Sequence, residues 1–178
     1  HSLHYEESSV IVIDAEFMRQ TVEIPANVGI FSTEWDVNGT RILTAAYEEE
    51  GVRIFDARTG ELDQQIGSLS DEYLSAGWSG DNTRILTEAY DNGDLISVWD
   101  TESGSNLLEM LYPLGVNNLI WNRDRNAVIL RRYPEMTATV IDLSSENPED
   151  TLITFQHPDT DLLGAAWSGD STHILTWT

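Results

Sequence analysis

The sequence predicts an all-β protein made of repeated units of four short strands. The first observation is a repeated phrase, because "WSGDNTRILT" starts at Trp78 and "WSGDSTHILT" starts at Trp167. The second is the period: related phrases contain Trp35 and Trp121, so the four tryptophans lie 43, 43 and 46 residues apart. The third is that short runs rich in Ile, Val, Leu and Thr alternate with Gly, Asn, Asp and Ser clusters, a pattern typical of strands joined by turns.

Each central repeat contains four such strands. In the second repeat we expect strand a over 74–78, strand b over 84–89, strand c over 95–100 and strand d over 106–111. The "SGDNT" segment between strands a and b predicts a tight turn, because Asp and Asn side chains bond to nearby backbone groups. Strand c ends on an aspartate in every repeat: Asp14, Asp56, Asp100 and Asp142. Four short strands in 43 residues match the period of a β-propeller blade.

The chain resembles the WD-repeat β-propeller family over essentially its whole length. The resemblance rests on the "WSGD" turns, on the "VWD" at 98–100 and its variants in the other repeats, and on the "TG" at 59–60 and "SG" at 103–104. The family's Gly-His before strand a corresponds here only to the "QH" at 156–157. Family members carry a buried hydrogen-bond network of a His, a Ser or Thr, an Asp and a Trp. No repeat of this chain has all four in register.

The resemblance implies a WD-repeat-like propeller of four blade equivalents, with the terminal blade split between the two ends of the chain. The segment 5–14 aligns with 47–56 without a gap, and 174–178 aligns with 42–46, so both ends fall inside strand b. We therefore expect one propeller module, which divides into strands c and d of the split blade over 1–24, blades over 25–66, 67–111 and 112–155, and strands a and b of the split blade over 156–178.

The split blade needs a complementary edge, because an incomplete sheet exposes unpaired backbone groups. Three arrangements provide one: a closed four-blade ring, an eight-bladed ring of two copies, or a larger propeller of which this chain is a fragment. We expect the second or third, because rings of WD-type blades usually have seven or eight blades. Self-association or a companion chain is thus an expected partnership.

The charge of the chain limits its partners. The sequence holds 31 acidic residues against nine basic ones, all arginine, for a net charge of −22. This balance argues against nucleic acid, which needs a basic surface. No apolar run approaches the roughly 18 residues of a membrane span, so no membrane partner is expected. The absence of cysteine excludes thiolate catalysis and cysteine-ligated metals, and it fits a cytoplasmic protein.

Motifs for catalysis are missing. The sequence has no phosphate-binding glycine loop, no G-x-S-x-G and no metal-binding spacing among its four histidines. We predict no catalytic residue, no cofactor and no metal site. The strand-c aspartates are interpreted as turn formers, His157 as a loop cap before strand a, and His173 as an exposed side chain beside strand b. The alternatives are a hydrolase with paired carboxylates near the central channel, or a fragment of a larger propeller with no independent function.

The tryptophans are interpreted as packing residues. Trp35, Trp78, Trp121 and Trp167 recur once per repeat, which predicts packing between neighbouring blades. Trp99 is expected in the core, and Trp177 has no counterpart in the other repeats.

Acidic residues gather in particular connections. In WD-repeat propellers the b–c and d–a connections share one face, and here these connections carry Glu6, Glu7, Glu48, Glu49, Glu50, Asp71, Glu72, Asp91, Asp94, Glu135, Asp159 and Asp161. On the opposite face, Asp residues offset the charges of Arg41, Arg84, Arg123, Arg125 and His173. The sequence thus predicts a non-catalytic protein-interaction scaffold whose acidic face binds a basic protein or peptide. The simpler alternative is that these loops are only well solvated.

Overall fold

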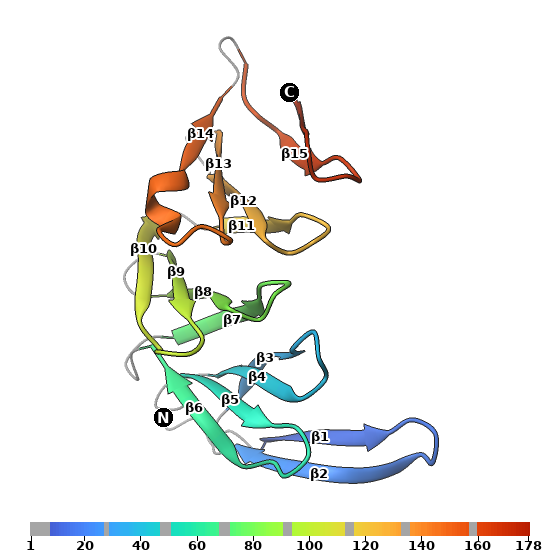
Figure 1. The fold of residues 1–178 in the computed structure, drawn as a ribbon. Coiled ribbons are helices and arrows are strands. Elements are labelled where there is room, and N and C mark those ends of the chain that lie inside the picture. Colours follow the sequence, from blue (N-terminus) through green and yellow to red (C-terminus); the bar gives the residue numbers. More distant parts are fainter. Residues whose placement is uncertain are drawn as a thin grey trace, which may run out of the picture.

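The computed structural model describes residues 8–26, 29–46, 51–67, 72–90, 94–112, 116–132, 136–156 and 160–178. These residues form three four-stranded and two two-stranded antiparallel sheets, with one short 3-10 helix. The sheets follow one another along an arc (Figure 1), and β6, β10 and β14 lie on its convex side. The predicted all-β propeller architecture is confirmed.

Each four-stranded sheet is one blade, with its strands in chain order. Blade 1 contains β3 (Ile30–Trp35), β4 (Arg41–Ala46), β5 (Val52–Asp56) and β6 (Leu62–Ile66). Blade 2 contains β7 (Glu72–Trp78), β8 (Arg84–Tyr90), β9 (Asp94–Asp100) and β10 (Asn106–Tyr112). Blade 3 contains β11 (Val116–Trp121), β12 (Ala127–Arg132), β13 (Thr137–Asp142), the 3-10 helix η2 (Pro148–Thr151) and β14 (Ile153–Phe155). The four strands of each blade serve as strands a to d.

Two half-blades flank these three blades. The N-terminal half-blade contains β1 (Ser8–Asp14) and β2 (Arg19–Ala26), which correspond to strands c and d. The C-terminal half-blade contains β15 (Gly164–Trp167) and β16 (Ile174–Trp177), which correspond to strands a and b. They are separate sheets at opposite ends of the arc, so the two halves of the split blade do not meet within one chain (Figure 1).

The repeated phrases fix the register between strands b and c. Arg84 pairs with Asp100 in blade 2, and Arg41 pairs with Asp56 at the same place in blade 1. A slip by one residue would turn every side chain to the other face of the sheet. Because both faces of a blade pack against neighbouring blades, the repeats keep one register.

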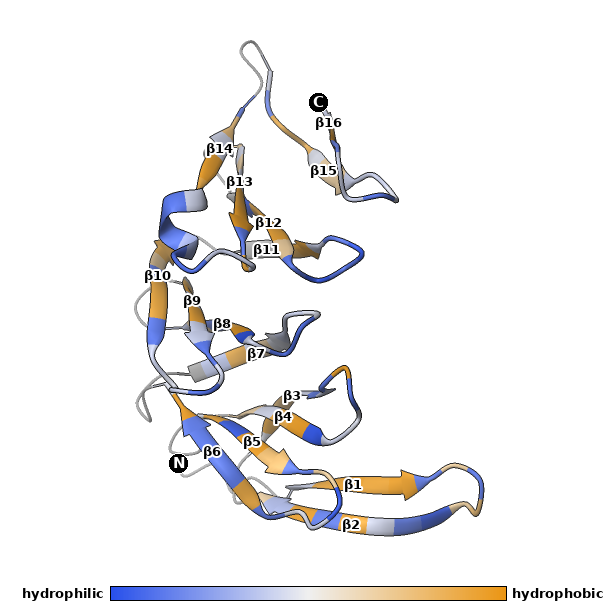
Figure 2. Cartoon of the chain, in the orientation of Figure 1, coloured by the Kyte–Doolittle hydropathy of each residue, from blue (hydrophilic) through white to orange (hydrophobic). Residues whose placement is uncertain are grey.

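The hydrophobic core consists of layers between blades. Between blades 1 and 2, Leu43 and Ile54 pack with Tyr73, Trp78 and Ile85. Equivalent clusters join the other neighbouring sheets. Figure 2 shows apolar segments on the strands and hydrophilic segments on many of the turns. Removal of apolar surface from water between the blades is the main force that holds consecutive blades together.

Three of the four repeated tryptophans pack on the preceding blade. Trp78 is 1% exposed. The Trp121 ring lies next to Gly77 of blade 2, where an added Cβ would be 3.2 Å from the ring. Nε1 of Trp167 donates to the Ile120 carbonyl of blade 3 at 2.9 Å. The prediction is wrong for Trp35, which is 49% exposed. The other tryptophans on strand a pack against strands a and b of the preceding blade. The sheet that precedes Trp35 is the N-terminal half-blade, whose two strands are c and d.

Candidate functional site

The ends of the strands at the b–c and d–a connections form one rim of each blade. In blade 1, the Ala46 amide donates to the Gly51 carbonyl at 3.0 Å. The last residue of β4 and the first residue of β5 therefore lie together at this rim. In blade 2, Glu72 pairs with Tyr90 across β7 and β8, and Tyr90 pairs with Asp94 across β8 and β9. Two acidic positions therefore flank one aromatic residue in adjacent strands.

Three of the predicted acidic residues lie in the described part of the chain. Glu72 and Asp94 are strand-end positions of blade 2, and Asp161 is exposed just before the C-terminal half-blade. The remaining predicted residues lie outside the described residues: Glu6, Glu7, Glu48, Glu49, Glu50, Asp71, Asp91, Glu135 and Asp159. The twelve predicted carboxylates are together called the acidic rim below.

Exposed apolar side chains that the sequence did not predict lie at the same rim. Tyr90 and Leu111 are more than half exposed in blade 2. Leu163 is also more than half exposed, and its amide donates to the Trp177 carbonyl at 2.9 Å. Strand alternation alone does not identify them, because both faces of a blade pack against neighbouring sheets. The exposed Tyr90 suits a protein interface, where aromatic residues are enriched.

The strand-c aspartates form turns on the opposite side of the blades, as predicted. In blade 1, Oδ1 of Asp56 accepts hydrogen bonds from the amides of Arg58 and Thr59 at 2.9 and 2.7 Å. In blade 2, Oδ1 of Asp100 accepts from the amide and hydroxyl of Ser103, both at 2.8 Å. Backbone hydrogen bonds from Thr59 and Ser103 are the leading causes that lower the pKa of these two carboxyls. These carboxylates are fixed in turns.

The a–b turns also depend on aspartates. Burial raises the pKa of Asp36, but hydrogen bonds from Arg41 and Thr40 outweigh it, so the net shift is downward. The pKa of Asp170 falls to about 2, because the hydroxyls of Ser168 and Thr172 and the Thr172 amide donate to its carboxylate. Every carboxyl with a resolved shift in the described part of the chain moves downward. A hydrolase needs a general acid with a raised pKa, so these shifts do not support the alternative.

Replacing Asp170 with asparagine is expected to lower stability at neutral pH and to flatten its dependence on acid. The folded pKa of about 2 is below the ordinary value of 3.8, so the ionised form stabilises the fold above about pH 4. That contribution is lost as pH falls through the folded pKa. Urea unfolding between about pH 7 and pH 2 measures it. Asp124→Asn is the control, because Asp124 occupies the same turn position in blade 3. An equal loss in both variants would contradict this role of Asp170.

Arginines of the a–b turns are neutralised by nearby acids. Nη1 of Arg84 lies 2.6 Å from Oδ2 of Asp100, and Nε of Arg41 lies 3.4 Å from Oδ2 of Asp36. The Arg41 guanidinium also stacks 4.4 Å above the Trp78 ring of the next blade. His173 is exposed, as predicted, and its Nδ1 lies 2.7 Å from the Thr172 hydroxyl. These arginines stabilise the blades and add little positive charge to this face.

One contact corresponds to part of the hydrogen-bond network that the resemblance to WD-repeat propellers implies. Nε1 of Trp99 donates to Oγ1 of Thr87 at 2.9 Å, so strands c and b of blade 2 are joined by the Trp and Thr members of that network. The predicted loop cap His157 lies outside the described residues. No group of three or more His, Asp or Glu side chains converges as a metal site within the described ranges. The same ranges contain no helix with the length and apolarity that a membrane crossing requires.

Comparisons with known proteins agree with this architecture. No family model matches the chain. The chain is 27% identical over 118 residues to THO complex subunit 3 of Arabidopsis thaliana. The aligned segment covers 66% of this chain and 36% of that protein. A chain in the crystal structure of the mitotic checkpoint complex superposes with a TM-score of 0.60 at 16% identity, over 89% of this chain and 49% of the other. This chain therefore spans about a third to a half of the length of these relatives.

Proposed function

We propose that this WD-repeat β-propeller chain is a protein-interaction scaffold whose acidic rim binds a basic segment of another protein. The observation that carries the proposal is the register of blade 2, which sets Glu72 and Asp94 on either side of the exposed Tyr90. Carboxylates attract arginine and lysine side chains, and an aromatic ring adds a surface on which a cation can stack.

The charge of the chain supports the same partner. A net charge of −22 raises the rate at which a cationic segment associates, and it disfavours nucleic acid. The two relatives bear the names of protein complexes, the THO complex and the mitotic checkpoint complex, which supports protein partners. The proposal has no cofactor and no catalytic step, and it includes the cytoplasmic location expected from the composition. It also includes completion of the split blade by a second chain, either another copy or a companion chain.

Titration of a fluorescent arginine-rich peptide tests the acidic rim. Affinity is expected to fall as ionic strength rises from about 50 to about 500 mM, because salt screens the attraction. The double variant Glu72→Gln/Asp94→Asn is expected to bind roughly tenfold more weakly. The control Glu102→Gln/Glu146→Gln removes the same charge from exposed turns on the other side of the blades. An affinity that is independent of salt, or an equal loss in both variants, would refute the proposal.

A further inference from the structure

We infer that the basic segment bound at the acidic rim carries a bulky apolar side chain, which packs on Leu74 and Phe31 on the concave side of the arc. This contact rests on the proposed function, because it is a second feature of the partner recognised at the same rim. The carboxylates attract the cationic residues of the segment, and the two exposed apolar residues select the side chain that accompanies them.

Strand a of each complete blade contains a β-bulge near its first residue. The register shifts between Ile30 and Ser32, between Tyr73 and Ser75, and between Val116 and Leu119. Phe31 and Leu74 are the extra residues in blades 1 and 2. A bulge turns a side chain away from its regular direction, and bulges are common next to functional sites. Strand a follows the d–a connection, so the bulges lie at the same end of the blades as the acidic rim.

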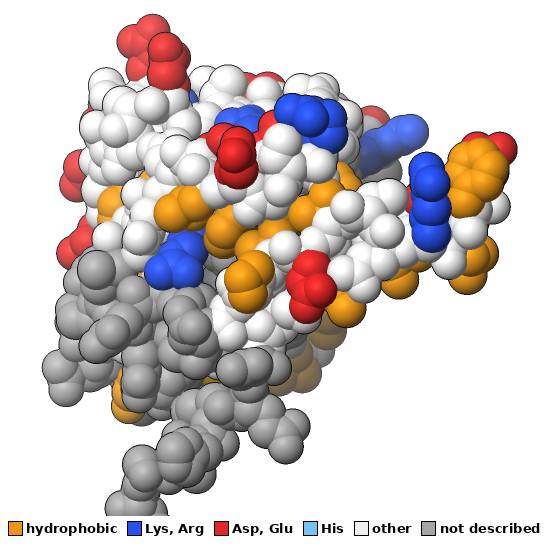
Figure 3. Space-filling model, turned by 90° about the horizontal axis from the view of Figure 1, so that it is seen from below, with side chains coloured by type: hydrophobic (Ala, Val, Ile, Leu, Met, Phe, Trp, Pro, Cys, Tyr) orange, Lys and Arg blue, Asp and Glu red, His pale blue; other side chains and the backbone are white. Residues whose placement is uncertain are grey.

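Leu74 is exposed in a blade that has a complete neighbour on each side. Tyr73 is 1% exposed in the core with blade 1, and Gly77 lies next to Trp121 of blade 3, so both faces of β7 are covered. Leu74 lies between them in the strand and is 37% exposed. Figure 3 shows other exposed apolar side chains at the β1–β2 end of the arc, where the described chain places no further sheet. The exposure of Leu74 has a different cause, which is the bulge.

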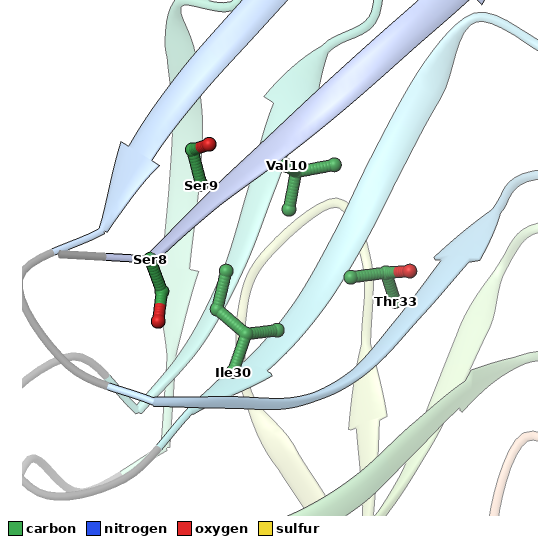
Figure 4. A pocket seen from close by; sticks show the side chains of 5 residues that line it. All are labelled: Ser8, Ser9, Val10, Ile30 and Thr33. Carbon is green, nitrogen blue, oxygen red and sulfur yellow. The ribbon is translucent and has the colours of Figure 1, made fainter. Parts of the chain in front are cut away.

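In blade 1 the bulge changes which side chains share a face of β3. A groove between β1 and β3 is lined by Ser8, Ser9, Val10, Ile30 and Thr33 (Figure 4). Ile30 and Thr33 are three positions apart, so a regular strand would turn them to opposite faces. They share the groove because the bulge adds one residue between them. Phe31 does not line this groove and is 53% exposed.

The two exposed residues lie on neighbouring strands on the concave side of the arc. Within their sheets, β3 and β7 are at the edge opposite β6 and β10, which lie on the convex side (Figure 1). The amides of Ala76 and Trp78 donate to side-chain oxygens of Ser32 and Glu34, at 3.2 and 3.1 Å. Because blade 1 occupies these donors at the edge of β7, a partner cannot use them to add a strand there. Recognition at this place therefore depends on side chains.

The spacing along β7 specifies the partner segment. Glu72 precedes Leu74 by two positions, which is about 7 Å in a strand. Asp161 precedes Leu163 by the same spacing at the equivalent place in the repeat. An extended segment covers this distance in two residues, so an arginine or lysine and a bulky apolar residue two positions away meet both features. A net charge of −22 favours such a cationic segment over an anionic lipid surface.

Two fluorescent peptides of equal charge test this contact. Both contain several arginines separated by glycines, and the first has leucine two positions from an arginine where the second has alanine. The unmodified chain is expected to bind the leucine peptide roughly fivefold more tightly, because leucine buries more apolar surface on Leu74 and Phe31. The variant Leu74→Ser is expected to bind both peptides equally. The control Leu62→Ser is expected to keep the preference, because Leu62 is half exposed on β6 at the convex side.

The outcomes separate this contact from the proposed function. Equal affinity of the two peptides for the unmodified chain would overturn the contact, and salt-dependent binding of both would then leave the proposed function standing without it. A leucine preference that survives in Leu74→Ser, with an unchanged circular dichroism spectrum, would also overturn the contact. If Leu74→Ser unfolds, the peptide comparison on the unmodified chain still decides.

The acidic rim is tested in the same series. Glu72→Gln/Asp94→Asn is expected to weaken both peptides by the same factor and to keep the leucine preference, because the carboxylates and the apolar residues recognise different side chains. Binding of neither peptide by the unmodified chain would overturn the proposed function and the contact together.

Discussion

Replacing Trp78 with alanine is expected to lower the free energy of unfolding by about 3–5 kcal/mol. The ring is 1% exposed in the core between blades 1 and 2, beneath the Arg41 guanidinium. Its removal leaves a cavity and exposes Leu43 and Tyr73 of the same cluster. Urea unfolding followed by circular dichroism measures the loss, together with the slope of the transition.

Two controls define the cause of this loss. Nε1 of Trp78 has no hydrogen-bond partner in the described structure, so Trp78→Phe is expected to cost much less than Trp78→Ala. Trp35 holds the same repeat position but is half exposed, so Trp35→Ala is expected to cost below about 1 kcal/mol. Equal losses at Trp35 and Trp78 would contradict the inter-blade origin of the stability.

Replacing Arg125 with alanine is expected to lower the free energy of unfolding by about 2–3 kcal/mol. Arg125 lies in the a–b turn of blade 3, and its Nη2 donates to Oε2 of Glu34 in blade 1 at 3.1 Å. Its Nε donates to the Trp78 carbonyl in blade 2 at 3.0 Å, and the guanidinium stacks 4.6 Å from the Trp121 ring. One side chain therefore joins three consecutive blades, and its loss leaves the Glu34 carboxylate without this ion pair.

The control for Arg125 is its neighbour in the same turn. Arg123→Ala removes the same charge from an exposed side chain and is expected to change stability by less than about 0.5 kcal/mol. Chemical denaturation of both variants at the same ionic strength compares them. If Arg123→Ala costs as much as Arg125→Ala, the effect comes from net charge, and the link between blades contributes nothing measurable.

Local chemistry explains what could be predicted. The repeated "WSGD" and "RILT" phrases combine turn residues with strand residues, and the structure has strands at those positions with turns between them. The interpretation of Asp56 and Asp100 as turn formers is confirmed, because each accepts backbone hydrogen bonds from residues only two or three positions away. Such short-range contacts can be read directly from the sequence.

Other features could not be predicted because their partners are distant in the chain. Glu34 and Arg125 are separated by 91 residues, and neither fits a repeated pattern. The flanking of Tyr90 by Glu72 and Asp94 depends on three adjacent strands and their register. The acidic rim could be proposed from composition, but its exposed apolar residues required strand faces to be known.

The number of repeats, the strands within each repeat and the aspartates that form the turns can be read from the amino-acid order alone. These depend on interactions between residues a few positions apart, and each repeat encodes them independently. Which copies of a repeated position are buried depends on how the sheets pack in three dimensions. Trp78 is covered and Trp35 is not, and Leu86 is covered and Leu175 is not, because burial depends on whether a neighbouring blade is there to remove the side chain from water.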